Sequence, residues 1–258
     1  PFAVGGGTDV VFRILVPYLS ENLGQSIVID NRPGGAATIG MDQAAKSAPD
    51  GYTLGVANVS FGVNPSLIAK MPFDSEKDLA PVSLVAMVPM VLAVHPSVPA
   101  RSVKELIALA KAKPGVLNYG SAGAGGSAHL VAELLAVRSH SPMLHVPFKG
   151  NAPAMTEVMA GRVDFMFYPM IGVGEREAQK QIRILASTTA KRHPDTPQVP
   201  TMAELGFPGF EEYVGPVGFV APAGTPQPIL DKLAAAIRGT LTKPAIEQRL
   251  KQLGSVVV

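Results

Sequence analysis

The sequence predicts an α/β protein of two domains that two strand-forming segments connect. Short apolar runs alternate with segments of helical spacing from the start of the chain, which is typical of parallel βαβ units. A second series of such units begins near residue 117. Two valine-rich passages, residues 82–94 and 212–224, flank that series and are well placed to run from one sheet to the other.

The composition fits a compact globular protein and excludes several functions. The 258 residues can form one large domain or two smaller ones, and 47% of them are hydrophobic against 16% charged. The net charge of +2 is scattered without a basic stripe, so we expect no nucleic-acid partner. The chain has no cysteine, which excludes disulfides, thiolate metal sites and a cysteine nucleophile. We expect a monomer.

The longest stretch without a formal charge, residues 79–100, has the length of a membrane span. Prolines and a histidine interrupt it, so we predict two consecutive buried strands around Pro89 instead. The chain begins within an apolar run, and we expect a leading strand, with anything before it, to be missing from this sequence. The absence of a visible signal peptide is therefore uninformative.

The first series begins with a helix at Asp9–Leu23, where apolar residues recur at helical spacing and Gly24 is a natural stop. Residues 26–31, with the sequence SIVIDN, are predicted to form a strand of the buried type. A glycine pair then precedes a helix within residues 36–51, and Tyr52–Asn58 is the next predicted strand.

A further helix is predicted to open at Ser102 and to run to about Lys113. Ser102 and Glu105 form a capping-box pattern, in which each side chain satisfies a free amide of the first turn. A fresh series of strands and helices follows. Its predicted strands are residues 117–120, 143–148, 163–168 and 182–188, and its predicted helices are residues 127–137 and 152–160, with Gly161 as a cap.

The two valine-rich passages set the predicted domain boundaries. If both cross between the sheets, the carboxyl-terminal helices at residues 228–241 and 244–254 return to the first domain. We therefore expect domain 1 to comprise residues 1–96 plus 222–258, and domain 2 to comprise residues 97–221. Two crossings form a hinge, and hinged domain pairs close on small ligands.

Glycine-rich loops precede several predicted helices. In an open parallel sheet, ligands bind at the carboxyl ends of strands, where helix amino termini present unpaired amides and a partial positive charge. Glycine lets the backbone itself approach an anion. We expect four such clusters to face one interdomain cleft, at Gly5–Thr8, Asn58–Asn64, Ser121–Ser127 and Gly150–Ala152. The alternative for each loop is a tight turn that needs glycine for steric reasons.

The motifs that would support catalysis are incomplete. Residues 123–128 match the glycine spacing of dinucleotide binders, but no acidic residue follows about 20 positions later to bind a ribose. Ser121 lacks the first glycine of a nucleophile elbow, and the sequence has neither a P-loop nor a zinc-protease motif. His129 and Glu133 share a helix face, but two groups do not form a metal site. We expect no enzyme activity, cofactor or metal.

Several motifs stand in the order and spacing of a known family. They include GGGTDVVFRILVPYLSENLGQSIVIDNRPGGAATIG, YGSAGAGGSAHLVAELL, HVPFKGNAPAMTEVMAGRVDFMF and GFVAPAGTP. Over nearly its whole length the chain resembles the tripartite tricarboxylate transporter substrate-binding proteins, also called Bug receptors. The resemblance implies a two-domain periplasmic binding protein of the Venus flytrap type, with two crossover strands and an interdomain ligand cleft. It also implies a small organic acid as ligand and the permease subunits of a membrane transporter as partners.

The resemblance also implies which residues bind the ligand. In the family, backbone amides and ordered waters hold one carboxylate between a glycine loop of the first domain and a loop of the second. The complete set of predicted ligand-binding residues is Gly6, Gly7, Thr8, Asp9, Asn58, Ser60, Ser121, Gly126, Ser127, His129, Gly150, Ala152 and Tyr168. Within this set we expect Asp9 to cap its helix, because a free carboxylate would repel the same anion.

Tyr168 marks a departure from the family pattern. Many members have an aspartate after this strand, a candidate partner for a ligand amino group, so the resemblance disfavours an amino-acid ligand here. Tyr168 either stacks on an aromatic acid, offers its hydroxyl to a second carboxylate, or caps the core. We expect a dicarboxylate or an aromatic acid as the ligand.

Two other functions stay open on the sequence. An enzyme acting on a small organic acid could use the same cleft. A ligand sensor, with a sensor kinase as its partner, could bind the acid without any role in transport. The identity of the acid lies beyond the sequence, because backbone amides recognise a carboxylate and not the rest of the molecule.

Overall fold

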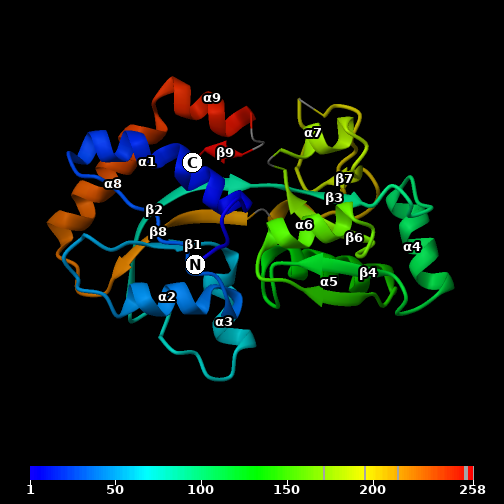
Figure 1. Cartoon of the computed structure of the whole chain (residues 1–258), viewed down its shortest axis with the longest axis horizontal. Coiled ribbons are helices and arrows are strands. Elements are labelled where there is room, and N and C mark those ends of the chain that lie inside the picture. The colour runs from blue at the N-terminus through cyan, green and yellow to red at the C-terminus, as the bar shows by residue number, and fades with distance from the viewer. Residues whose placement is uncertain (171, 195, 214, 253–254, 258) are drawn as a thin grey trace. The chain divides into compact units, whose positions relative to one another are not determined.

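The computed structural model describes residues 1–170, 172–194, 196–213, 215–252 and 255–257. The chain forms two compact units, and Figure 1 shows the helices and strands of each. Unit 1 comprises Pro1–Met87 and Pro216–Val258, and unit 2 comprises Val88–Gly215. Each unit has a β-sheet of its own, and each is described here by itself.

The chain passes between the units within the two valine-rich passages. Strand β2 (Leu79–Val88) belongs to the sheet of unit 1, and strand β3 (Met90–Val94) belongs to the sheet of unit 2. The prediction of two consecutive strands around Pro89 is therefore confirmed. The return passage forms strand β8 (Gly215–Pro222) in the sheet of unit 1, and Val214 before it lies outside the described residues.

The units divide at residues 87/88 and 215/216, whereas the sequence placed the boundaries at 96/97 and 221/222. The first difference arises because all of β3 pairs with strands of unit 2. The second arises because β8 pairs with β1 (Gly55–Ala57) of unit 1, with Val56 opposite Phe219. Strand pairing, which a single sequence does not display, thus decides both boundaries.

The sheet of unit 1 has the strand order β1-β8-β2-β9. Strand β1 runs antiparallel to β8, and β9 (Val256–Val257) runs antiparallel to β2. These pairings differ from the parallel βαβ units that the first series predicts. The difference follows from residues 26–31, the expected neighbouring strand, which join no described sheet.

Residues 26–31 have no regular secondary structure, so the strand predicted there is wrong. Their side chains alternate between exposed and partly buried, and Val28 is 86% exposed. The Ile27 amide donates to Ser20 Oγ at 3.1 Å, but the amides of residues 28–30 have no acceptor within the described part of the chain. An extended segment becomes a strand when a neighbour pairs with it, and no described strand does so here.

Helix α1 (Gly7–Leu23) supplies an apolar face to unit 1 and packs against α8 and α9. Val11, Leu15 and Leu19 recur at helical spacing and are buried. The helix ends as predicted at Gly24, whose φ of 65° lies in the left-handed region that glycine enters at little cost. The other helices of unit 1 are the 3-10 helix η1 (Gly35–Ala37), α2 (Thr38–Ala45), α3 (Val59–Leu67), α8 (Gln227–Leu241) and α9 (Pro244–Gln252).

The sheet of unit 2 has the strand order β5-β4-β6-β3-β7. Strand β4 runs parallel to β5 and to β6, as the second series predicts, whereas β3 runs antiparallel to β6 and β7. The bounds of these strands are β4 Asn118–Ser121, β5 Leu144–Pro147, β6 Phe165–Pro169 and β7 Arg183–Ser187. The carboxyl ends of β4, β5 and β6 therefore lie at one edge of the sheet, which is where ligands bind in α/β proteins.

Both faces of the sheet in unit 2 are buried. Along β6, Phe165 and Phe167 belong to one apolar cluster, while Met166 and Tyr168 belong to another. This period of two is typical of a strand that is covered on both faces. The helices of unit 2 are α4 (Val103–Ala112), α5 (Ser127–Ser139), α6 (Asn151–Met159), α7 (Val173–Ala178) and the 3-10 helix η2 (Phe210–Tyr213).

The start of α4 confirms the predicted cap with one change of partner. Ser102 Oγ accepts a hydrogen bond from the Glu105 amide at 3.2 Å. The Glu105 carboxylate accepts from the Arg101 amide at 2.6 Å, one residue before the amide that a capping box would use. The two side chains still satisfy backbone donors on both sides of the helix start.

Candidate functional site

The loop before α1 leaves the first amides of the helix free. Gly5 has a φ of 76°, and Gly6 before the first helical residue has φ −71° and ψ 159°. The Gly6 amide turns back to the Ala3 carbonyl at 3.3 Å. Within the described residues, the amides of Gly7 and Thr8 have no acceptor. Such amides, together with the helix dipole, favour an anion at this position.

The Asp9 side chain holds this loop in shape. Its Oδ2 accepts hydrogen bonds from the Gly5 amide at 2.9 Å and from Arg13 Nε at 2.8 Å, and its Oδ1 accepts from Asn31 Nδ2 at 2.8 Å. Burial acts to raise the pKa of Asp9, but these hydrogen bonds outweigh it, so the pKa lies below its ordinary value of 3.8. The carboxylate is thus ionised at neutral pH and engaged inside the loop.

A second helix start in unit 1 follows β1. Asn58 precedes α3, and its Oδ1 accepts a hydrogen bond from the Ser60 amide at 2.9 Å, so its side chain caps the helix. Ser60 is buried behind that cap. The predicted site residues that unit 1 contains are Gly6, Gly7, Thr8, Asp9, Asn58 and Ser60.

The loop before α5 in unit 2 repeats the backbone of the loop before α1. Gly125 has a φ of 78°, and Gly126 has φ −71° and ψ 157°. The Gly126 amide donates to the Gly123 carbonyl at 3.2 Å, which is the same turn as in the first loop. Among the residues that the structure describes, the amides of Ser127 and Ala128 have no acceptor. This loop therefore offers an anion the same backbone donors.

The two loops are stabilised by side chains at equivalent positions. The Gly125 amide donates to His129 Nδ1 at 3.2 Å, four residues ahead, just as the Gly5 amide donates to the Asp9 carboxylate four residues ahead. The acceptor is a carboxylate in one loop and an imidazole in the other. The two loops thus share their geometry and differ in the chemistry that fixes it.

Ser121, at the end of β4, is bonded within the second loop. Its Oγ lies 2.6 Å from His145 Nε2 and accepts a hydrogen bond from the Gly123 amide at 3.0 Å. The Ser121 hydroxyl can also donate to the carbonyl oxygen of Gly123, which lies 3.1 Å away. The Ser121 side chain is fully buried, so its hydroxyl shapes the loop from the inside.

A cluster of tyrosine and histidine rings lies next to the Ser121 hydroxyl. The ring centroid of His145 lies 5.0 Å from that of Tyr119 and 4.2 Å from that of His129. The Tyr119 hydroxyl donates a hydrogen bond to Glu133 Oε1, and burial raises the pKa of Tyr119, with this carboxylate adding to the shift. The cluster joins β4, β5 and α5 behind the glycine loop.

Burial keeps both imidazoles of the cluster neutral at pH 7. It lowers the pKa of His129, against the attraction of the Glu133 carboxylate. Burial, together with the charge that His129 carries when protonated, lowers the pKa of His145 to about 4. A neutral imidazole has one nitrogen free to accept a hydrogen bond, which is what the Gly125 amide requires of His129.

A third helix start lies at the same edge of the sheet in unit 2. The Phe148 amide after β5 donates to the Ser121 carbonyl at 2.9 Å, which holds the two loops together. Gly150, with a φ of 144°, then leads into α6. In the described part of the chain, the amides of Asn151 and Ala152 have no acceptor. The edge formed by β4 and β5 thus carries two helix amino termini with free donors.

Tyr168 lies inside β6 and is 2% exposed, so it has the core position that the sequence left as one of its options. The Arg176 guanidinium of α7 lies 5.4 Å from the centre of the tyrosine ring. Burial raises the pKa of Tyr168, and the charge of Arg176 opposes that shift. Whether the hydroxyl meets a ligand stays a prediction.

Sequence reasoning did not single out three residues beside this site. His145 matches none of the catalytic or metal-binding motifs considered, although it contacts Ser121. Asn151 has a buried Oδ1 without a partner in the described structure, and Arg176 is a cation beside Tyr168. A glycine followed four residues later by a polar acceptor, as in Gly5 and Asp9, is the pattern that would have pointed to the loop interior.

Unit 2 brings its own predicted residues together at the carboxyl ends of β4, β5 and β6. These residues are Ser121, Gly126, Ser127, His129, Gly150, Ala152 and Tyr168. The loops that follow β4 and β5 are in direct contact through the Phe148 amide, and Tyr168 belongs to the neighbouring strand. That a single ligand contacts both this set and the set in unit 1 stays a prediction.

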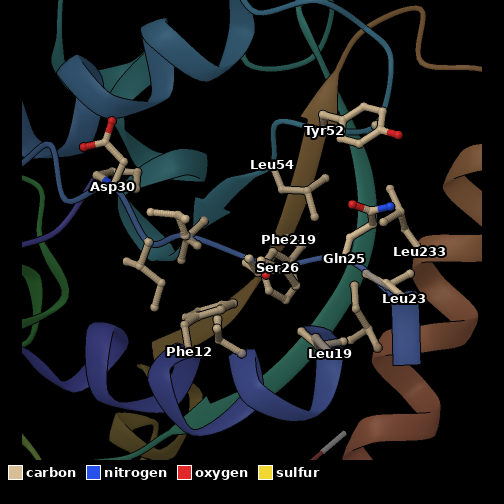
Figure 2. A pocket seen from close by; sticks show the side chains of 18 of the residues that line it. Phe12, Leu19, Leu23, Gln25, Ser26, Asp30, Tyr52, Leu54, Phe219 and Leu233 are labelled. Atoms are coloured by element: carbon tan, nitrogen blue, oxygen red, sulfur yellow. The ribbon is translucent and has the colours of Figure 1, made fainter. Parts of the chain in front are cut away.

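An apolar groove of about 620 Å³ lies in unit 1. Figure 2 shows Phe12 and Leu19 of α1, Leu54 before β1 and Phe219 of β8 around it. The charged side chains that line it are Asp9, Asp30, Asp50 and Lys232. Three carboxylates against one ammonium group give the groove a net negative charge, and its apolar walls offer an anion no hydrogen bonds, so this groove is a poor site for a carboxylic acid.

The described residues contain no group of three His, Asp or Glu side chains that could hold a metal ion. They also contain no helix of sufficient length and apolar character to cross a membrane.

A sequence model described as "Tripartite tricarboxylate transporter family receptor" matches residues 11–258. The chain belongs to this family. Its membership confirms the resemblance drawn from the glycine-loop motifs, and it makes the protein a solute receptor of the Bug type.

Solved structures agree with the family assignment. The periplasmic binding protein BugD has a TM-score of 0.94 and 34% sequence identity, over 100% of this chain and 86% of BugD. MatC from Rhodopseudomonas palustris, solved with bound malate, has a TM-score of 0.94 and 32% identity, over 100% of this chain and 87% of MatC. A second R. palustris protein, solved with adipate, has a TM-score of 0.94 and 35% identity, with coverage of 100% and 86%. The predicted fold class, a periplasmic binding protein with two α/β parts, is therefore confirmed.

Proposed function

We propose that this protein is a periplasmic receptor that binds a small carboxylic acid and delivers it to the permease subunits of a tripartite tricarboxylate-type transporter. The observation that carries the proposal is the repeated loop. Before α1 and again before α5, a glycine of positive φ and an extended glycine leave the first helical amides without acceptors in the described structure. Each loop can therefore receive a carboxylate through its backbone.

The strength of backbone recognition indicates that more than one loop takes part. A hydrogen bond to a charged group contributes about 1.5–3 kcal/mol, so two amides of one loop supply about 3–6 kcal/mol. A micromolar dissociation constant corresponds to about 8 kcal/mol, and ordering the ligand costs part of what the contacts supply. We therefore expect the acid to engage the amides of Gly7 and Thr8 as well as those at the starts of α5 and α6.

A dicarboxylate or an aromatic acid suits this site better than an amino acid. MatC and the second R. palustris protein were solved with malate and adipate, which each have two carboxylates. At Tyr168 this chain lacks the aspartate that the family pattern offers to an amino group. Arg176, beside that tyrosine, is a cation that a second carboxylate can use.

The contacts of Ser121 argue against the enzyme alternative. Ser121 Oγ and His145 Nε2 lie 2.6 Å apart, which is the separation of a nucleophile and its base. The hydroxyl is fully buried, however, and it is also bonded to the Gly123 amide and carbonyl. The nearby Glu133 carboxylate accepts from Tyr119, and within the described residues it has no hydrogen bond with His145 that would orient this histidine. Recovery of a chemically altered acid after incubation with the protein would support the enzyme alternative instead.

A thermal-shift screen tests the receptor proposal. Succinate, malate, adipate, benzoate and glutamate are compared at equal concentration, with adipamide as an uncharged control of the same size as adipate. A bound acid at one hundred times its dissociation constant stabilises by about 2.7 kcal/mol, which raises Tm by about 5–10 °C in a protein of this size. We expect a dicarboxylate or benzoate to give this shift and adipamide to give none. A shift with glutamate alone would contradict the ligand class.

Uptake by cells separates transport from sensing. Deleting the gene should abolish accumulation of the radiolabelled acid, and restoring the gene should return it. Normal uptake in the deletion strain, with lost transcriptional response to the acid, would favour the sensor instead.

A further inference from the structure

The acceptor that fixes the second loop can gain a proton in acidic solution, below the ordinary imidazole pKa of 6.5, whereas the acceptor that fixes the first loop stays ionised there. Asp9 is a carboxylate whose charge persists well below neutral pH. His129 accepts the Gly125 amide hydrogen at its Nδ1, so that nitrogen must carry no proton. Protonation of the ring places a hydrogen on Nδ1 and turns the contact into two donors facing each other. The bond between Gly125 and His129 therefore exists only while the imidazole is neutral.

The surroundings of His129 hold it in that neutral form. The ring of His145 lies 4.2 Å away, so two protonated rings would repel each other. The charged and titratable groups that face the pair are Glu133 on α5 and Tyr119 on β4, and the tyrosine hydroxyl donates to that carboxylate. From β6 the neighbouring ring is Phe165, which does not titrate. The Glu133 carboxylate attracts protons to both histidines, but burial opposes it more strongly.

The pair also supports the start of the loop. His145 Nε2 holds Ser121 Oγ at 2.6 Å, and that oxygen accepts the Gly123 amide. The loop from Ser121 to Gly126 is thus held at one end by His145 and at the other by His129. Gly123 and Gly125 have φ of 118° and 78°, which glycine adopts at little cost, and the two histidine contacts select this loop conformation among those open to glycine.

We propose that His129, with His145 behind it, is a positioning residue that presents the amides at the start of α5 to the ligand carboxylate, and that protonation of this pair releases the ligand as the pH falls. The inference rests on the proposed receptor function and adds a regulation to its site. It assigns no contact between the histidines and the acid. The loop before α1, fixed by Asp9, stays in place over the same pH range, so release acts through unit 2.

The first experiment follows the loop without any ligand. Amide and ring resonances of the isotopically labelled full chain are recorded between pH 8 and pH 4.5. We expect the Gly125 amide signal to move with the same midpoint as the His129 ring, and that midpoint to lie below 6.5. A His129 ring that titrates while the Gly125 amide signal stays constant would overturn the inference.

Two histidine variants separate positioning from folding. His129→Asn keeps an acceptor near the position of Nδ1 but cannot be protonated, whereas His129→Ala removes the acceptor. The control is His140→Asn at the other end of α5, because His140 is exposed and has a left-handed φ of 51°, which asparagine also adopts. Adipate affinity is measured by calorimetry at pH 7 and pH 5 for the wild type and all three variants.

The expected result is a loss of pH dependence in both His129 variants, with the wild-type affinity at pH 7 kept in His129→Asn and reduced in His129→Ala. Wild type and His140→Asn should bind adipate about tenfold more weakly at pH 5 than His129→Asn does, which is the change expected from one lost hydrogen bond. Adipate itself gains protons in this range, but equally for every variant. Equal affinities at pH 5, or tighter binding by the wild type, would disprove release by protonation. If none of the screened acids binds at either pH while the Gly125 amide titrates as expected, the proposed function fails and the loop mechanism stands.

Discussion

The loops Gly5–Asp9 and Gly125–His129 belong to different units, yet their first two glycines have nearly the same backbone angles. In both, a glycine near φ 77° precedes an extended glycine, and the amide of the first glycine bonds a side chain four residues ahead. The sequences GGGTD and GGSAH share just the two glycines at their start. An anion site of this kind is therefore specified by backbone conformation and not by the side chains around it.

The difference between the loops lies in what secures them. The Asp9 carboxylate accepts hydrogen bonds from Gly5, Arg13 and Asn31, so it anchors the first loop to other parts of unit 1. The His129 imidazole accepts a hydrogen bond from one backbone amide and lies against the tilted ring of His145. The first loop is thus held by a permanent charge, and the second by a group whose charge depends on pH. We therefore expect the two loops to contribute equally to acid binding, but we expect Asp9 to contribute more than His129 to the free energy of unfolding.

The largest expected effect is the loss of acid binding in Gly7→Val. A valine at the first helical position places two methyl groups beside the free amides, so the carboxylate cannot approach them. We expect affinity to fall more than about 100-fold, the equivalent of losing two charge-assisted hydrogen bonds. This affinity is measured by calorimetry with the acid that gives the largest thermal shift in the screen.

Gly239→Val is the matched control for that change. Gly239 is an exposed helical glycine of α8, and a Cβ there meets nothing within 4 Å. Its valine variant should bind the acid normally and melt within a few degrees of the wild type. Retained affinity in Gly7→Val, with normal folding, would show that the first loop does not hold the carboxylate.

The next effect concerns stability, where Asp9→Ala should cost more than His129→Ala. Loss of the Asp9 carboxylate leaves the Gly5 amide without its acceptor and removes the bonds from Arg13 and Asn31, so we expect a decrease of about 2–3 kcal/mol in the free energy of unfolding. His129→Ala removes one hydrogen bond from a backbone amide and should lower the free energy of unfolding by about 1 kcal/mol. Urea denaturation at pH 7.5 compares the two, and equal costs would contradict the difference in anchoring.

The pH dependence of these two costs has a definite sign. The pKa of Asp9 is lowered by folding, so its contribution is present above about pH 3.8 and is lost as the pH falls through the folded value. The pKa of His145 is lowered to about 4, so the unfolded chain takes up its proton first and stability falls from about pH 6.5 toward pH 4. His129 acts in the same direction. Between pH 7 and pH 5, the cost of Asp9→Ala should stay constant while that of His129→Ala shrinks.

The smallest expected effect comes from adding single methyl groups to both loops. A Cβ on Gly6 would lie 3.4 Å from the Ala3 carbonyl oxygen, and one on Gly126 would lie 3.3 Å from that of Gly123. Both residues have an ordinary negative φ. Gly6→Ala and Gly126→Ala should therefore weaken acid binding by less than about threefold, and to a similar degree. A large loss in one variant alone would break the equivalence of the two loops.

Local signals in the sequence predicted most of the helices and the strands of unit 2. Helix α1 ends at the glycine that was expected to end it, and α4 begins at its predicted cap. The strand at residues 26–31 was wrong because an apolar alternation shows that a segment can pair but not that a partner lies beside it. The domain boundaries shifted for the same reason, since the pairing of β3 is a long-range contact.

Some residues of the candidate site could likewise be predicted from the sequence, and others could not. Gly6, Gly126 and Gly150 could be found because consecutive glycines before an amphipathic helix are a local pattern. The contact between Ser121 and His145 could not, because it depends on the parallel register of β4 and β5, which pairs His145 with Tyr119, two residues before Ser121. Tyr168 was foreseen as a choice between ligand and core, and burial on both faces of β6 places it in the core.

The groove in unit 1 has a consequence for the behaviour of the purified protein. One of its sides is the outer edge of β1, and another is the extended segment Ile27–Asn31, so two rows of backbone groups flank an apolar floor. An additional extended chain inserted there would pair on both sides and bury its own apolar residues in the same step. Sheet completion, by a neighbouring stretch of polypeptide or by a second molecule, is therefore the association to which this unit is most susceptible.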